Sequence, residues 1–258
     1  MKPPSRSALA LMAHPDDIEI LCAGALIHLK RRGWKIHMAT MTSGDCGTKT
    51  HSSTEIQRIR YQEALRSARL LGATYDCVGE KDFQVFHSVS LLQKVTELIR
   101  RYNPSIVFTH PPSDYMTDHE ECSTAVRMGC FAGGCPNFFT RAASPAPSTD
   151  HVPHLFYADP VEGKDIYGTP SPVGFYVDTS ATTAFKARML ACHASQRLWL
   201  KQHHHLDHYI KSMKAWSAKR GRECGARYAE GYRQHLGQGY PQENALKKAL
   251  GRLVHDGG

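Results

Sequence analysis

The chain has 258 residues, of which 41% are hydrophobic and 22% are charged, as is usual for soluble globular proteins. No apolar stretch approaches the roughly 20 residues of a membrane-spanning helix, and the apolar run near the N-terminus is too short for a signal peptide. We therefore expect a cytoplasmic protein with no membrane partner. The net charge of +8 raises the question of nucleic acid, but no basic stretch is interleaved with aromatic residues, so we expect no nucleic-acid partner.

Strand-like and helix-like segments alternate along the chain, which is typical of βαβ units and a parallel sheet. The expected strands cover residues 8–12, 35–42, 75–78, 105–109, 154–157 and 174–178. The expected helices cover residues 18–29, 54–71, 90–101 and 183–216, the last broken near residue 201. The pattern predicts an α/β fold with a Rossmann-like, mostly parallel sheet flanked by helices, in one domain covering residues 1–258.

The alternation breaks at residues 129–150, where Gly, Ala, Pro and Ser dominate. An inserted loop of this length is usually a lid, a binding loop or a disordered insert. Its three phenylalanines favour contact with a substrate, although anchoring of the loop to the core is an equally open interpretation. Residues 183–258 are predicted to form a C-terminal helical part.

Polar side chains gather directly after the first predicted strand, at His14, Asp16 and Asp17. In open α/β sheets, binding sites are built at the carboxyl ends of strands. A histidine and a carboxylate three residues apart can hold one metal ion, and the spare carboxylate can act on a water molecule. A single Asp could instead cap the following helix, so this segment alone leaves a capped turn and a metal site equally open.

A second polar group follows the fourth predicted strand, from His110 to His119. If the first and fourth strands are neighbours in the sheet, His119 can reach an ion held by His14 and Asp17. Three protein ligands with open positions are typical of catalytic zinc sites, although iron(II), cobalt or manganese would suit the same ligands. The two groups together favour a metal site over a capped turn.

A third group of histidines lies in the predicted C-terminal helix, at His203, His204, His205 and His208. His204 and His208 are four residues apart and would share a helix face, which permits metal binding. The surrounding apolar residues describe an ordinary amphipathic helix. We interpret these histidines as a solvated polar face and leave them out of the predicted site.

At these positions the sequence resembles the zinc-dependent N-acetylglucosamine deacetylases, the PIG-L/LmbE-like family. Ala13-His14-Pro15-Asp16-Asp17 is similar to the family's first motif, and Asp118-His119 is similar to its second. Weaker similarities lie in the loop at 42–47, in the helix at 60–72 and in the segment at 177–196. The resemblance therefore spans most of residues 8–200.

The resemblance implies that the chain is a metal-dependent N-deacetylase, a hydrolase of amide C–N bonds. It implies that His14, Asp17 and His119 bind Zn2+ and that Asp16 is the general base. Zinc would lower the pKa of a bound water toward about 7 and polarise the acetamide carbonyl. The substrate-binding residues that the resemblance implies are Ser43, Asp45, Arg60 and Asp82.

One position departs from the family's pattern. Family members commonly carry a histidine that supports the oxyanion where this chain has Met116, whose side chain cannot donate a hydrogen bond. Either zinc alone stabilises the oxyanion or another donor replaces the missing one. His110 is the first candidate for this catalytic role and His154 the second, while a structural His110 bonded to backbone is equally open.

Within the family, the sequence looks most like the deacetylases of teicoplanin-type glycopeptide antibiotic biosynthesis. The expected substrate is then the N-acetylglucosaminyl group of a glycopeptide pseudoaglycone, a glycosylated peptide that would yield glucosamine and acetate. One alternative is a deacetylase of a smaller N-acetylglucosamine glycoside. Another is a non-catalytic sugar-binding relative, which Met116 keeps open.

Overall fold

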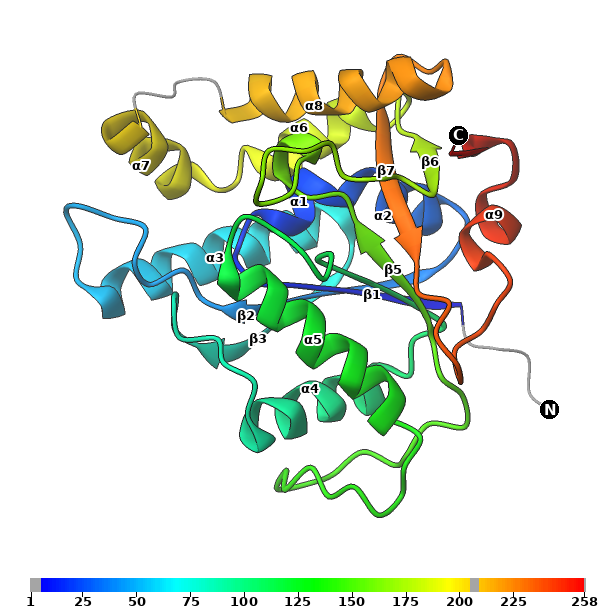
Figure 1. The fold of residues 1–258 in the computed structure, drawn as a ribbon. Coiled ribbons are helices and arrows are strands. Elements are labelled where there is room, and N and C mark those ends of the chain that lie inside the picture. Colours follow the sequence, from blue (N-terminus) through cyan, green and yellow to red (C-terminus); the bar gives the residue numbers. More distant parts are fainter. Residues whose placement is uncertain (1–5, 205–208, 258) are drawn as a thin grey trace.

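A single mixed sheet runs through the centre of the computed structural model, which describes residues 6–204 and 209–257. Within these residues the sheet has eight strands in the order β3-β2-β1-β4-β5-β7-β6-β8 (Figure 1). The strands are β1 (Ser7–Met12), β2 (Lys35–Thr42), β3 (Thr74–Glu80), β4 (Ile106–Thr109), β5 (His154–Ala158), β6 (Phe175–Asp178), β7 (Ala229–Gln234) and β8 (Val254–Asp256). Strands β3, β2, β1, β4 and β5 pair in parallel, and the remaining pairs are antiparallel. The predicted mostly parallel α/β fold is confirmed.

Helices cover both faces of this sheet (Figure 1). They are α1 (Asp17–Leu21), α2 (Ala23–Arg31), α3 (Ser53–Leu71), α4 (Val89–Tyr102), α5 (Thr117–Ala132), α6 (Thr183–Leu190), α7 (Ala194–His204), α8 (Tyr209–Cys224) and α9 (Ala245–Leu250). Along β1, Ala8 and Ala10 belong to the core under α2, whereas Leu9 and Leu11 belong to the core under α4 and α5. Because both faces are buried, the strand reads as a continuous apolar run. None of the described helices is long and apolar enough to cross a membrane.

Helix α3 forms where its capping residues predict it. The Ser52 side chain accepts from the backbone of Glu55, and the Glu55 carboxylate accepts from the backbone of Ser52, which is a capping box. Gly72 ends the helix in the left-handed conformation, with φ 64°. These signals fix the helix from which Arg60 extends.

The C-terminal part differs from the prediction for residues 183–258, because it contains strands as well as helices. β7 inserts between β5 and β6, and β8 pairs with β6. The helical stretch that begins at Thr183 ends at Leu190, well before the break expected near Lys201. His205 and His208 lie outside the described residues.

The predicted loop at 129–150 also has different bounds, since α5 continues to Ala132. The segment that follows is fastened along α4, where Gln93 donates to the carbonyl oxygen of Phe139 at 2.9 Å. Arg100 donates to the carbonyl oxygens of Gly133 and Cys135 at 3.1 and 2.6 Å, and the Thr140 hydroxyl donates to Glu97 at 2.6 Å. With a rise of about 1.5 Å per residue, α5 separates the start of this segment from Thr117 by about 24 Å. From there the segment turns back below α4 (Figure 1).

Candidate metal centre

The candidate site lies at the carboxyl ends of β1 and β4. These strands are adjacent and parallel, with Ala8 opposite Ile106 and Ala10 opposite Phe108. Because β2 lies on the other side of β1, the strand order reverses here, which is where open α/β sheets place their sites. The expected neighbourhood of the first and fourth strands is confirmed.

His14, Asp17 and His119 converge at this edge, and all three are buried. The Nδ1 atom of His14 lies 3.3 Å from Nε2 of His119. Oδ2 of Asp17 lies 3.4 Å from Nδ1 of His14 and 3.6 Å from Nε2 of His119. The three atoms form a possible metal site, and two imidazoles with one carboxylate suit zinc and other divalent transition metals.

Each of the two histidines is oriented by a second carboxylate, which the sequence did not lead us to expect. Oδ2 of Asp118 lies 3.2 Å from Nε2 of His14, and Oδ1 of Asp114 lies 3.0 Å from Nδ1 of His119. A carboxylate at the outer nitrogen holds the proton there and leaves the inner nitrogen with its lone pair exposed. This arrangement is usual behind histidines that bind metals, so the residues present fit a metal ion.

The electrostatics of the group favour a bound positive charge. Burial lowers the pKa of His14, but the hydrogen bonds with Asp118 and Asp17 outweigh it and raise this pKa to about 10. Burial raises the pKa of Asp17, but His119 and His110 hold it well below its usual range. The cluster therefore attracts a cation, either protons or a metal ion.

Asp16 occupies the N-cap position of α1 but its side chain makes no capping hydrogen bond, so the capped-turn interpretation does not describe it. Its backbone is left-handed, with φ 103°, which is rare for a residue other than glycine. Oδ1 lies 3.5 Å from the Arg60 guanidinium, and Oδ2 accepts a hydrogen bond from the Tyr209 hydroxyl. Burial raises the pKa of Asp16 to about 6 although Arg60 opposes the shift.

The four predicted substrate-binding residues surround a loop beside this group. Arg60 is buried and donates to the carbonyl oxygens of Pro15 and Gly44 at 2.8 and 3.4 Å. The carboxylate of Asp82 accepts from the hydroxyl of Thr42 at 2.6 Å. These contacts shape the loop.

The same loop is held together by its own acidic residues. Oδ1 of Asp45 accepts from the backbone N–H of Asp82 at 2.8 Å, and Oδ2 of Asp82 accepts from that of Cys46 at 3.0 Å. Asp45 and Asp82 are buried, whereas Ser43 is half-buried. Of the four, Arg60 reaches Asp16 at 3.5 Å and Asp82 lies 4.0 Å from His14, while Asp45 joins them through the backbone of Asp82. Ser43 lies in the same loop and is the most open to solvent of the four.

His110 is fully buried against the metal group, and its ring stacks on His119 with centroids 3.8 Å apart. Its Nε2 lies 3.0 Å from the backbone nitrogen of Ala13 and 3.1 Å from Oδ2 of Asp17. His154 begins β5 opposite Ile106, at the amino-terminal end of the parallel strands. The expectation that His154 could support the oxyanion is wrong, because His154 lies at the amino-terminal ends of the strands and the metal group lies at their carboxyl ends.

Tyr115 also lies beside the metal group, although no motif in the sequence marks it. Its ring packs edge-on against His119, with centroids 5.3 Å apart, and it is 58% exposed. Burial raises the pKa of Tyr115, and so do Asp17, Asp114 and Asp16. The phenol therefore stays protonated, and a protonated phenol is a hydrogen-bond donor.

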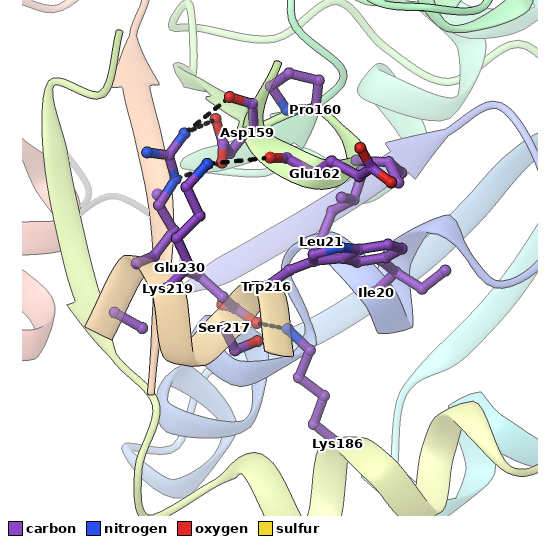
Figure 2. A pocket seen from close by; sticks show the side chains of 15 residues that line it. Ile20, Leu21, Asp159, Pro160, Glu162, Lys186, Trp216, Ser217, Lys219 and Glu230 are labelled. Atoms are coloured by element: carbon purple, nitrogen blue, oxygen red, sulfur yellow. Dashed lines mark hydrogen bonds and ion pairs between the residues drawn. The ribbon is translucent and has the colours of Figure 1, made fainter. Parts of the chain in front are cut away.

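Two hollows lie near these elements. One of about 220 Å³ is lined by residues that follow β4 and β5, including Pro111, Pro112 and Ser113 of the segment that leads to Asp114. The other, of about 40 Å³, lies beside α8 (Figure 2). There Lys186 donates to Glu230 at 2.7 Å. This volume is room for a few water molecules, each of which needs about 10–15 Å³.

Residues 9–129 match the family model described as PIG-L: GlcNAc-PI de-N-acetylase. All four residues of the predicted metal site and general base, His14, Asp16, Asp17 and His119, fall inside the matched segment. A curated relative, the 4-oxalmesaconate hydratase of Pseudomonas putida, is 25% identical over 127 residues, or 46% of this chain and 49% of the hydratase. The chain thus matches about half the length of that relative.

Solved structures share the fold over most of the chain. The N,N'-diacetylchitobiose deacetylase of Pyrococcus horikoshii is 22% identical, with a TM-score of 0.74 over 90% of this chain and 84% of the deacetylase. The zinc-inhibited form of a teicoplanin deacetylase is 12% identical, with a TM-score of 0.61 over 90% of this chain and all of that one. At these identities the likeness establishes the architecture.

Proposed function

We propose that this protein is a metal-dependent N-deacetylase of the PIG-L family that hydrolyses the acetamide of an N-acetylglucosaminyl group. The observation that carries the proposal is the convergence of His14, Asp17 and His119 at the switch point of the sheet, each histidine backed by a carboxylate. The match of residues 9–129 to the family model supports it.

His14, Asp17 and His119 would hold a zinc ion. When bound, zinc would polarise the acetamide carbonyl and make water a better nucleophile. Asp16, the adjacent carboxylate, receives the proton of the attacking water and later delivers it to the departing amine nitrogen. Arg60 and Tyr209 hold its carboxylate in place from either side.

The donor for the oxyanion must come from a residue other than Met116, which precedes α5. We expected His110 in this catalytic role, but it is fully buried and its Nε2 is already engaged by the Ala13 backbone and by Oδ2 of Asp17. We therefore assign His110 to positioning His119, on which it stacks. The phenol of Tyr115, beside His119 and exposed, is the better candidate for the oxyanion donor.

For the substrate we propose the N-acetylglucosaminyl group of a glycopeptide pseudoaglycone, with smaller N-acetylglucosamine glycosides as the alternative. The sequence resemblance to deacetylases of teicoplanin-type biosynthesis supports this choice. The loop after α5 gives it no direct support, because its bonds run to Gln93, Glu97 and Arg100 on α4 and not to the metal group.

A second candidate function is hydration of an unsaturated carboxylic acid, which the similarity to the 4-oxalmesaconate hydratase favours. Incubation of the zinc-loaded protein with each substrate class, followed by mass spectrometry, separates the candidates. Loss of one acetyl group from an N-acetylglucosaminyl glycopeptide, absent after chelation, supports the proposal. Addition of water to the unsaturated acid, with every acetylated sugar intact, would favour the hydratase instead.

A further inference from the structure

We propose that Phe83, Phe86 and Val89 form a binding surface for the apolar aglycone of the substrate. This apolar strip lies between β3 and α4, in a segment that the predicted metal site and the family resemblance left aside. The proposal names the substrate class for the deacetylase proposed above and rests on that function for the identity of the sugar.

The strip exposes large apolar side chains from a segment that is otherwise fixed. Phe83, Phe86 and Val89 are 65%, 62% and 69% exposed, whereas Val85 between them is fully buried in the core under α4 and α5. Clustered exposed apolar side chains mark contact sites more often than isolated ones do. Val85 thus anchors the segment while its neighbours face solvent.

Hydrogen bonds place the strip at the metal centre. The backbone N–H of Phe83 donates to Oδ2 of Asp118 at 2.6 Å, and the same oxygen lies 3.2 Å from Nε2 of His14. Further along, the backbone N–H of His87 donates to Glu121 at 3.0 Å. Both acceptors lie in the first turns of α5, next to His119, so the segment borders the candidate metal site.

The backbone of Phe83 supports a functional interpretation. Its φ is 62°, in the left-handed region that bulky residues rarely adopt. Such conformations are concentrated at binding and active sites, where surrounding contacts hold them. Here the bond to Asp118 holds the conformation that exposes the ring.

The chemistry of the strip indicates its occupant. Two phenylalanine rings offer flat apolar faces, which suit a planar aromatic or alkyl group better than a polar sugar. An N-acetylglucosaminyl group placed at the metal centre would leave its aglycone beside this segment. The exposed Phe131 offers no such continuity, because it lies in the last turn of α5, at the opposite end of that helix from His119.

The test is calorimetric binding to the zinc-loaded full chain, with 4-nitrophenyl N-acetylglucosaminide as the aryl probe and methyl N-acetylglucosaminide as the small one. We expect the double variant Phe83→Ala/Phe86→Ala to weaken aryl binding by about 10-fold or more. Binding of the methyl glycoside should stay within about twofold. Phe131→Ala, an exposed phenylalanine at the far end of α5, is the matched control and should leave both affinities unchanged.

Equal aryl affinity in the double variant and the wild type would overturn the proposal, and so would equal weakening for both glycosides. If the strip binds a partner protein instead of the substrate, the double variant and the wild type would bind the aryl glycoside equally. The single variant Phe86→Ala, which leaves the Phe83 backbone untouched, repeats the test if the double variant unfolds. Tight aryl binding that depends on the strip but yields no acetate would support the binding surface and contradict the proposed deacetylase activity.

Discussion

The hydroxyl of Tyr209 donates a hydrogen bond to the carboxylate of Asp16, joining two residues 193 positions apart in the chain. Tyr209 is the first residue of α8, and both side chains are buried. Arg60 lies 3.5 Å from the other oxygen of the same carboxylate. The C-terminal part of the chain thereby completes a site whose other residues come from its first half.

Tyr209→Phe should lower kcat about 10-fold and leave KM nearly unchanged, because it removes a bond that orients the general base without touching the sugar. Steady-state kinetics on the zinc-loaded protein measure both constants. Tyr176→Phe is the matched control, since the Tyr176 hydroxyl bonds Glu223 away from the site. A rise in KM alone would show that Tyr209 contacts the substrate.

Asp16→Asn should lower kcat by about 10²–10⁴-fold, the usual contribution of a general acid–base group. Zinc content should not change, because Asp16 is not among the three candidate ligands. Turnover and bound metal are measured on the same preparation. Full activity of Asp16→Asn would remove this residue from the chemistry.

Asp118→Asn should weaken zinc binding by about 10–100-fold, as loss of a carboxylate behind a metal-binding histidine usually does. The reason is that Asp118 holds the proton on the outer nitrogen of His14. Competition with a chromophoric chelator gives the affinity. The control is Asp256→Asn, whose carboxylate bonds Lys247 at the surface, and it should bind zinc as the wild type does.

Zinc affinity should rise as the pH increases from 6 to 9. Without metal, neighbouring carboxylates raise the pKa of His14 to about 10, so its imidazole is protonated over this range. Binding must displace that proton, and fewer protons compete at higher pH. Calorimetry in buffers of different ionisation enthalpy should show proton release on zinc binding. An affinity independent of pH would exclude His14 as a ligand.

The sequence patterns predicted those strands and helices whose apolar runs and capping residues lie close together in the chain. The apolar runs of β1 and β4 and the polar residues after each strand indicated both halves of the metal site before their adjacency was known. β7 escaped prediction because it contains Glu230, a charged residue in a buried strand. Most partners of its carboxylate are distant in the chain, namely the backbone of Gly24 and Ala25 and the side chain of Lys186.

The same limit applies to the site itself. The carboxylates of Asp114 and Asp118 lie within the polar segment after β4, yet only the folded structure shows which histidine each one orients. Tyr209 carries no local signal, since its partner is reached by packing of α8 against the turn after β1. The contacts of His110 with Ala13 and Asp17 join residues 97 and 93 positions apart, which no local residue pattern encodes.

The central claim is that the metal held by His14, Asp17 and His119 drives deacetylation. Its most direct test is titration of chelated, metal-free protein with zinc while acetate release from an N-acetylglucosaminyl glycoside is recorded. The account predicts no release without metal, a linear rise to saturation at about one zinc per chain, and no recovery in His119→Ala. Acetate release by the metal-free protein, or none at saturating zinc with either glycopeptide or small glycosides, would contradict it.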